Sequence, residues 1–407
     1  MAPGDDRIRS YYLFRAVTSF SLWMPFWTLW AYRNLDSYFL LTLVDVGFWT
    51  TMMAFQVPAG LLGDKYGRKR VLFVGELLAG LGILAFGLST QFWQLFASNI
   101  FWSMGVCFVV SGDTPFVYDT LTEVGRAKEF IGVMARAWAV QSVVNAIACV
   151  TGGVLVQWVW HDRFDLTLII SAVISMAGTA TVLLLKEPVA GRKEFASYKV
   201  QLAEGWKTVR TSRAIMVLIL FQLVIEISTY VMAVFRSVYM NETLKLDSFP
   251  IGAAIGAFTL FGGIAAMQAG RIEQDFGEKT SLLVLLVTII GSFAVVFAVG
   301  SWWAIVVQFP IYAVYYLQSP IIGGYINRRV DSSHRSTVVG ISSLIFTIAL
   351  TAVEVPSGFL ANMIGTRETM AILAVAMTPI GFYLLSIWYK EVDASKKTKK
   401  VRMLKQF

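Results

Sequence analysis

The stretch GLLGDKYGRKR occupies residues 60–70 and joins two long apolar segments of the chain. Gly60 lets two helices approach closely because it has no side chain. Gly67 permits a backbone turn that bulkier residues resist. Asp64 places an anion where it can meet a helix N-terminus or an arginine, and the basic residues that end the stretch are typical of a cytoplasmic connector. The stretch therefore predicts a tight polar loop between two membrane-spanning helices.

The composition of the chain points to lipid as its solvent. The 407 residues are 57% hydrophobic and 15% charged, with a mean hydropathy of +0.65. An ordinary soluble domain has roughly 45–50% apolar and about 25% charged residues. A water-soluble fold could not bury this much apolar surface, so the composition predicts an integral membrane protein.

A membrane-spanning helix needs about 20 mainly apolar residues. Twelve segments of the chain meet this requirement, and each must be a helix because lipid offers no partner to free backbone groups. We predict an all-α protein with spans at residues 10–31, 38–62, 71–89, 92–117, 130–157, 166–185, 213–240, 248–270, 280–300, 302–325, 337–363 and 368–389.

The distribution of Lys and Arg predicts the orientation. With the N-terminus inside, 27 basic residues fall in the inner connectors and tails and only four in the outer connectors. This asymmetry places both termini in the cytoplasm of a multi-pass protein of the cell membrane. It also accounts for the net charge of +8 without a nucleic-acid partner. We expect the basic C-terminal tail to meet anionic lipid headgroups.

The longest connector divides the spans into two sets of six. We predict an N-terminal six-helix bundle over residues 1–185, a cytoplasmic linker over 186–212, a C-terminal six-helix bundle over 213–390 and a basic tail over 391–407.

The loop at residues 60–70 resembles the G-x-L-x-D-x-x-G-R-[KR] motif of the major facilitator superfamily, which that family keeps between spans two and three. The end of span two, VPAGLLGD at 57–64, is similar to VPSGFLAN at 355–362 in span eleven, as expected of nested repeats. Residues 111–121, SGDTPFVYDTL, resemble an ending of span four found in many poorly characterised prokaryotic members.

The resemblance implies the fold of this family, with two pseudo-symmetric six-helix bundles that rock around a central site. It also implies that the loop docks against the start of span eleven and latches the outward-facing state. We interpret a set of residues at the cytoplasmic end as the gate motif: Gly60, Asp64, Gly67, Arg68, Lys69, Asp119 and Arg335.

Two positions depart from the drug/proton antiporters of the same family. Those proteins usually have an arginine in span four, where this chain has Asn99. Their span five usually has a G-P-x-x-G-G element, of which only Gly152 and Gly153 remain. The departures weaken the case for export by antiport, and a proton-coupling role at position 99 does not carry over.

Three acidic residues inside the spans are candidates for proton coupling. Glu226 and Glu354 lie near the middle of spans seven and eleven, and Asp45 lies in the outer half of span two. A charge near the bilayer centre costs at least about 2.5–3.5 kcal/mol. A carboxyl kept from water favours its neutral form and can exchange a proton near neutral pH. The alternative for Glu226 is a structural role, paired with an arginine from another span.

Four further ionisable residues lie in the inner halves of the spans: Arg15, Glu76, Asp113 and Arg136. We interpret Arg15 as an anchor at the inner interface. We interpret Asp113 as part of an acidic end of span four that forms gate salt bridges.

The resemblance implies that spans one, four, seven and ten line the substrate cavity. Gln141 and Asn145 share one face of span five, where they either line this cavity or join helices. Aromatic residues in spans one, seven and ten are further candidates, with ordinary packing as the alternative reading: Trp23, Phe26, Tyr230, Tyr312, Tyr315 and Tyr316.

The leading hypothesis is a proton-coupled secondary transporter of a small organic solute or drug that works by alternating access. An uncoupled facilitator of a nutrient, metabolite or lipid is the second, and a channel or transport-inactive sensor is the third. The chain has no phosphate-binding glycine loop, and its two cysteines and two histidines lack metal-ligand spacing. We therefore expect no enzyme activity, no cofactor and no metal. The expected partners of this monomer are a small-molecule substrate, protons and membrane lipids.

Overall fold

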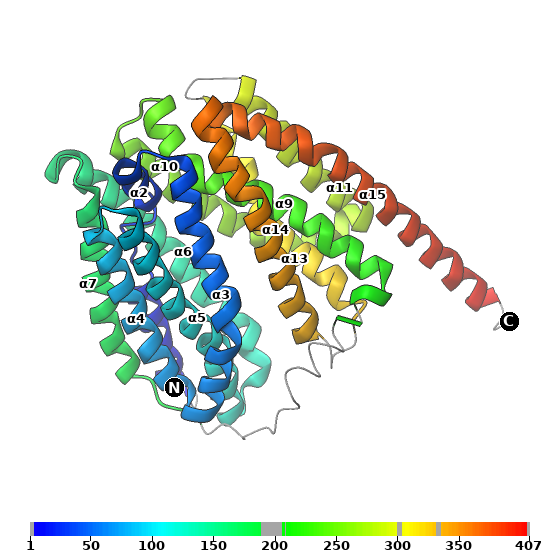
Figure 1. Ribbon diagram of the computed structural model, residues 1–407. Helices are drawn as coiled ribbons and strands as arrows, with labels where there is room; N and C mark the ends of the chain where they lie inside the picture. Colours follow the sequence, from blue (N-terminus) through cyan, green and yellow to red (C-terminus); the bar gives the residue numbers. More distant parts are fainter. Residues whose placement is uncertain (1–3, 189–205, 208, 299–302, 331–334, 405–407) are drawn as a thin grey trace. The chain divides into compact units, whose positions relative to one another are not determined.

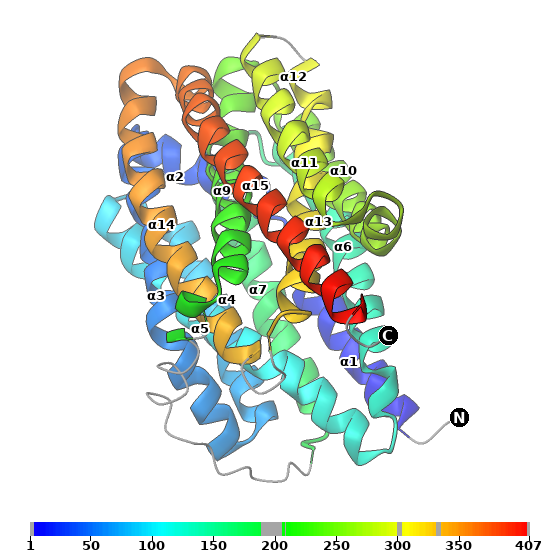
Figure 2. The ribbon, with the colours of Figure 1, turned by 90° about the vertical axis from the view of Figure 1, so that its right-hand side faces the viewer.

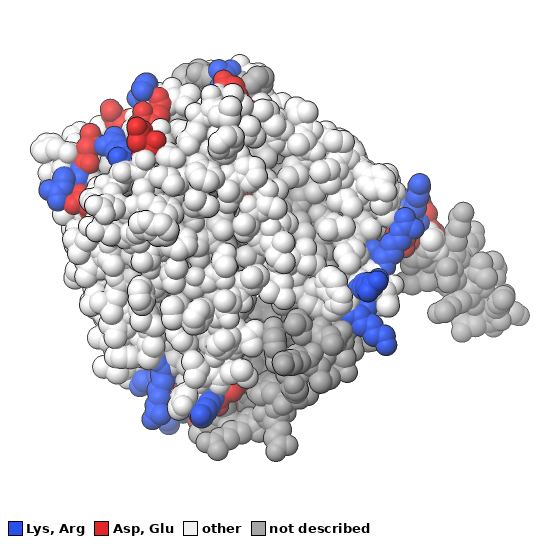
Figure 3. Space-filling model, in the orientation of Figure 1, with Lys and Arg blue, Asp and Glu red and all other residues white. Residues whose placement is uncertain are grey.

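A computed structural model describes residues 4–188, 206–207, 209–298, 303–330 and 335–404 of the chain. These residues form helices and turns, with no strand among them, so the predicted all-α fold is confirmed (Figures 1 and 2). Eleven of the described helices are long and apolar enough to cross a membrane. They correspond to predicted spans two to twelve. On the face drawn in Figure 3, uncharged side chains cover most of the surface of the described residues.

The chain divides into two compact units. Unit 1 comprises Met1–Glu194 with Val234–Leu260, and unit 2 comprises Phe195–Ala233 with Phe261–Phe407. Most of the predicted linker at 186–212 lies outside the described residues, and the predicted domain boundaries stay predictions.

The first half of the chain supplies the larger part of unit 1. Its elements are α1 (Asp5–Thr18), α2 (Trp27–Leu35), α3 (Tyr38–Tyr66), α4 (Arg68–Leu88), α5 (Phe92–Glu123), η1 (Ala127–Glu129), α6 (Phe130–Val154), the π-helix η2 (Leu155–Val159) and α7 (Phe164–Leu183).

The second half of the chain begins with two helices that both units share. Its elements are α9 (Arg213–Val238), the π-helix η3 (Tyr239–Thr243), α10 (Ser248–Met267), α11 (Ala269–Ala298), α12 (Trp303–Val306), α13 (Gln308–Asn327), α14 (Arg335–Ile364) and α15 (Thr366–Leu404). The start of α10 packs closely on α6, because a Cβ at Gly252 would lie 2.4 Å from the carbonyl oxygen of Cys149.

The prediction of one continuous helix over residues 10–31 was wrong, because the chain leaves the helix between α1 and α2. Pro25 has no N–H for the helical ladder. The amides of the break instead close short turns, such as Phe26 N to Trp23 O at 2.8 Å. A Cβ at Gly152 would lie 2.9 Å from Leu22 O, so the break packs directly against the backbone of α6. Irregular backbone at membrane depth is tolerated where protein buries it in this way.

A ladder of hydrogen bonds joins α3 and α5. Four small side chains of α5, spaced four residues apart, donate to carbonyl oxygens of α3 that have the same spacing. The bonds are Asn99 Nδ2 to Val44 O (2.7 Å), Ser103 Oγ to Phe48 O (2.6 Å), Cys107 Sγ to Met52 O (3.7 Å) and Ser111 Oγ to Gln56 O (3.2 Å). The constant offset means that the two helices run parallel in one register. Asn99, the departure noted in the sequence, is therefore a rung of this ladder.

Glycines bring α4 and α5 into backbone contact. A Cβ at Gly105 would lie 2.2 Å from the backbone nitrogen of Ala79, and a Cβ at Gly82 would lie 2.4 Å from that of Trp102. Small residues of this kind replace the hydrophobic effect as the source of helix packing in lipid.

We expect Gly105→Ala to destabilise the protein by about 1–3 kcal/mol, because the new methyl group would force the two backbones apart. Thermal unfolding of the purified protein in detergent measures the effect. Gly132→Ala is the matched control, since nothing lies within 4 Å of a Cβ at Gly132. Equal unfolding temperatures for the two variants would contradict the packing argument.

Candidate functional site

A buried polar cluster joins α1, α5 and α6 inside unit 1. The guanidinium of Arg15 lies 3.8 Å from Asp113 Oδ2 and donates a hydrogen bond to Gln141 Oε1. The hydroxyl of Tyr11, one turn earlier on α1, donates to Asp113 Oδ1 at 2.9 Å. Tyr11 is only 2% exposed and Asp113 only 7%. Arg15, which the sequence assigned to an interface, thus turns inward and connects a carboxylate to a predicted cavity residue.

Glu76 of α4 belongs to the same cluster. Its side chain is 6% exposed, and Arg15 and Asp113 are the described charged groups that act on it. Its contact on α7 is the hydroxyl of Ser175, 3.5 Å from Oε2. Glu76, Arg15, Asp113 and Ser175, together with Tyr11 and Gln141, are called the unit-1 polar cluster below. It holds two carboxyl groups and one guanidinium, drawn from three helices.

Glu226, the first candidate from the sequence, lies on α9 in unit 2. Its Oε1 accepts hydrogen bonds from Gln318 Nε2 of α13 at 3.0 Å and from Gln222 Nε2 at 3.4 Å. Within the described part of the chain, no cationic side chain forms an ion pair with it. Amide donors stabilise a carboxylate but do not neutralise its charge. The arginine partner of the alternative interpretation is thus absent from the described residues.

The other two predicted coupling residues are also buried. Glu354 of α14 is fully buried and belongs to unit 2 with Glu226, whereas Asp45 of α3 is 3% exposed and belongs to unit 1.

The predicted cavity residues of unit 1 differ in their surroundings. Trp23 lies in the break after α1 and meets the ring of Trp102 edge-on, with ring centroids 4.5 Å apart. Phe26 has no exposed surface and packs on Phe164, which places it in the core. Asn145 lies one helical turn beyond Gln141 on α6.

In unit 2, Tyr230 lies on α9 one turn beyond Glu226 and meets Phe346 of α14 edge-on. The three tyrosines of α13 form a group in which Tyr312 and Tyr316 stack in parallel. Tyr316 packs against Gly262 of α10, and Tyr315 is 40% exposed.

The loop between α3 and α4 is held by charges. Asp64 pairs with Arg68 one turn later, and Arg68 Nε lies 3.8 Å from Asp119 Oδ2 of α5. Gly67 has φ +100°, a conformation that favours glycine. Nothing described lies within 4 Å of a Cβ at Gly60, so the close approach expected there is not seen in the described residues. Arg335 begins α14, but its side chain lies outside the described residues.

Glu187 completes this loop, although the sequence analysis did not single it out. Its carboxylate accepts from the backbone N–H groups of Arg68 (2.7 Å) and Lys69 (2.9 Å), at the N-terminus of α4. The ammonium of Lys69 donates to the carbonyl oxygen of Leu183 at 2.8 Å. An acidic residue directly after span six was the only sequence signal for this cap.

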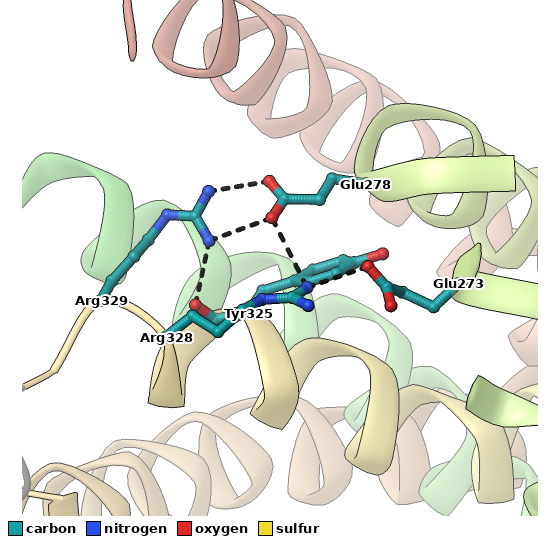
Figure 4. Close-up of polar contacts among 5 residues, drawn as sticks. All are labelled: Glu273, Glu278, Tyr325, Arg328 and Arg329. Atoms are coloured by element: carbon teal, nitrogen blue, oxygen red, sulfur yellow. Dashed lines mark hydrogen bonds and ion pairs between the residues drawn. The ribbon is translucent and has the colours of Figure 1, made fainter. Parts of the chain in front are cut away.

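The second half has a corresponding charged loop (Figure 4). Gly277, at φ +68°, interrupts α11 just before Glu278. Glu278 pairs at 2.7 Å with Arg329, which lies just after α13, and Arg328 pairs with Glu273 at 3.0 Å. Residues 270–279, GRIEQDFGEK, keep the acid, glycine and base of the first loop with a different spacing, whereas only the structure shows their arginine partners.

The end of α1 that leads into the unit-1 polar cluster is fixed by ion pairs. Arg126 bridges Asp5 Oδ1 (2.7 Å) and Glu129 Oε2 (2.8 Å), and Arg7 pairs with Glu123 at 3.1 Å. The hydrogen bonds from Arg126 hold the pKa of Glu129 below its usual range.

Comparisons with known proteins agree on one family. The model of the Major Facilitator Superfamily matches residues 12–239 and 227–406. The chain is 21% identical over 305 residues to a class H tetracycline resistance protein of Pasteurella multocida, covering 73% of each chain. It is 26% identical to multidrug resistance protein 1 of Bacillus subtilis, covering 60% of this chain and 62% of that one.

Solved structures show the same fold. The nucleoside transporter NupG superposes with a TM-score of 0.76 at 13% identity, covering 94% of this chain and 99% of that one. A bacterial homolog of the human lysosomal transporter Spinster superposes with a TM-score of 0.74 at 11% identity, covering 94% and 96%.

We expect the Arg126–Glu129 pair to stabilise the protein at neutral pH and to lose this effect in acid. A lowered folded pKa gives stability that is present above the unfolded pKa of glutamate, about 4.3, and lost as pH falls through the folded value. Arg126→Gln should therefore lower the unfolding temperature slightly at pH 7, and the effect should vanish once both Glu129 and Asp5, its second partner, are protonated. Melting curves of both proteins from pH 7 to pH 3 test this. Lys128→Gln is the control, and a difference that persists in strong acid would contradict the linkage.

Proposed function

This chain belongs to the Major Facilitator Superfamily and is a membrane transporter rather than an enzyme, and on that premise we propose that it moves a small organic solute or drug in exchange or symport with protons. The two halves of the chain would alternate access to a central site, as repeat-built transporters do. Both termini would be cytoplasmic, and the protein would act as a monomer in the cell membrane.

The environment of Glu226 carries the proposal of proton coupling. A carboxylate at mid-span costs several kcal/mol unless a cation or a proton neutralises it. In the described part of unit 2 only the amides of Gln318 and Gln222 bond to it. A proton removes the cost, and its loss to water on opening of the site restores the charge. Glu226 therefore fits a proton carrier better than a structural ion pair.

The names of the relatives support the class of solute. Proteins named for resistance to tetracycline and to multiple drugs match more than half of the chain. The aromatic residues Tyr230 and Trp23 would contribute apolar surface for such a molecule, and Gln141 and Asn145 would contribute hydrogen bonds. Glu354 and Asp45 remain secondary candidates for proton binding.

The hydrogen-bond ladder between α3 and α5 argues against proton coupling at position 99. Asn99 is 1% exposed and donates to Val44 O, so a bulky arginine has no room there. The charged loop of Asp64, Arg68 and Asp119 would serve as the gate, together with Arg335.

We expect Glu226→Gln to abolish proton coupling while leaving solute exchange intact, because glutamine keeps the shape and the hydrogen bonds but cannot titrate. A thermal-shift screen of drugs and metabolites that includes tetracycline first selects the solute, since ligands that bind the folded state stabilise it. Flux in proteoliposomes is then measured with and without a pH gradient. Gradient-driven accumulation should fall by about tenfold or more.

Glu242→Gln is the control, since Glu242 is a partly exposed acid at the outer end of the same chain segment. Counterflow of labelled solute should persist in both variants. Accumulation that survives in Glu226→Gln would favour an uncoupled facilitator or another proton carrier. The absence of counterflow in the unaltered protein would favour a channel or a sensor.

A further inference from the structure

The unit-1 polar cluster has an imbalance of charge. Asp113 and Glu76 are both more than nine-tenths buried, and Arg15 is the one cation that acts on Glu76 among the described residues. If both carboxyl groups were ionised, one negative charge would remain without a counter-ion. An uncompensated buried charge costs several kcal/mol. The cluster is therefore most stable when it holds one proton.

The hydrogen bonds indicate which carboxyl group holds that proton. Asp113 accepts from the hydroxyl of Tyr11 at 2.9 Å and faces the guanidinium of Arg15 at 3.8 Å. Donors and cations stabilise the ionised form of a carboxyl group. Among the described residues, Glu76 accepts only from the hydroxyl of Ser175, at the long distance of 3.5 Å. Asp113 is thus the better-stabilised anion, and the proton belongs on Glu76.

The surroundings of Glu76 contain no other described group that would change this assignment. α4 packs on α5, α7 and α3. From these helices and α1, the groups that act on Glu76 are Asp113, Ser175 and Arg15. Ser175 carries no charge at any relevant pH, so the balance among the other three decides the state of the cluster.

We propose that Glu76 is a second proton-binding site of this transporter, separate from Glu226, and that its ionisation controls the position of Arg15. While Glu76 is protonated, Arg15 bonds to Asp113 and Gln141. When Glu76 releases its proton to water, the new carboxylate attracts the guanidinium away from Gln141. The amide of Gln141 is then free to bond a solute. The link to solute rests on the proposed function, whereas proton binding at Glu76 does not.

The position of Arg15 makes such a shift consequential. It lies in the last turn of α1, and its carbonyl oxygen accepts from Ser19 N at 3.1 Å, where the helix ends. The break between α1 and α2 begins at Ser19. A movement of Arg15 between Gln141 and Glu76 therefore acts at the end of α1, next to the break in the first span.

Infrared difference spectroscopy of the purified protein tests the proton site without any solute. Protonated carboxyl groups have a C=O stretch that ionised carboxylates lack. We expect Glu76→Gln to remove one protonated-carboxyl component from the spectrum at neutral pH. This substitution keeps the side-chain shape and the neutral state, so the protein should fold with an unchanged unfolding temperature. Glu242→Gln, which alters a partly exposed acid, should leave the component in place.

A second variant separates a proton site from a merely structural glutamate. In Asp113→Asn the competing anion is gone, so Arg15 should pair with Glu76 and Glu76 should ionise. The same component should then disappear although Glu76 is still present. If the protonated-carboxyl component keeps its full intensity in Glu76→Gln, or in folded Asp113→Asn, the proposal is overturned. If Asp113→Asn does not fold, the Glu76→Gln spectrum alone decides. Glu226→Gln should retain the Glu76 component, so failure of the proposed function and failure of this inference give different results.

Discussion

The cost of an uncompensated charge inside a membrane governs the polar interior of this protein. Lipid cannot solvate a carboxylate, so each one needs a cation, strong hydrogen-bond donors or a proton. Asp113 has Arg15 and the hydroxyl of Tyr11. Glu226 has two amides, and Glu76 has one distant hydroxyl. This order of decreasing stabilisation separates a permanent anion from the two groups that we assign to protons.

The scaffold around these groups is built from close backbone contacts. Glycines such as Gly105 bring α4 and α5 together, and the ladder headed by Asn99 fixes α5 on α3. The carboxyl groups of Glu76 and Asp113 are therefore held on a rigid pair of helices. Arg15 comes from α1, whose last helical residue, Thr18, lies three residues later. The cation thus comes from the end of a helix that borders a break in the first span, whereas the two carboxyl groups come from helices in backbone contact.

The two charged loops show how related repeats use different charges for one purpose. Gly67 and Gly277 both adopt positive φ just before a helix. In the first half the base follows the glycine, as Arg68, and pairs with an acid of α5. In the second half the acid follows the glycine, as Glu278, and pairs with Arg329, just after the end of α13. The geometry is repeated while the signs of the charges are exchanged.

The sequence alone determined the membrane class, the helical spans two to twelve and the family, because hydropathy, charge asymmetry and the loop at 60–70 are local signals. It also placed Glu226 at mid-span. It missed the break at residues 19–26, since a window of hydropathy does not register a missing backbone hydrogen bond at Pro25. Only the tertiary structure brought Arg15, Glu76 and Asp113 together. Depth along each helix can be counted from sequence, but the direction in which a side chain points depends on how its helix is rotated against its neighbours.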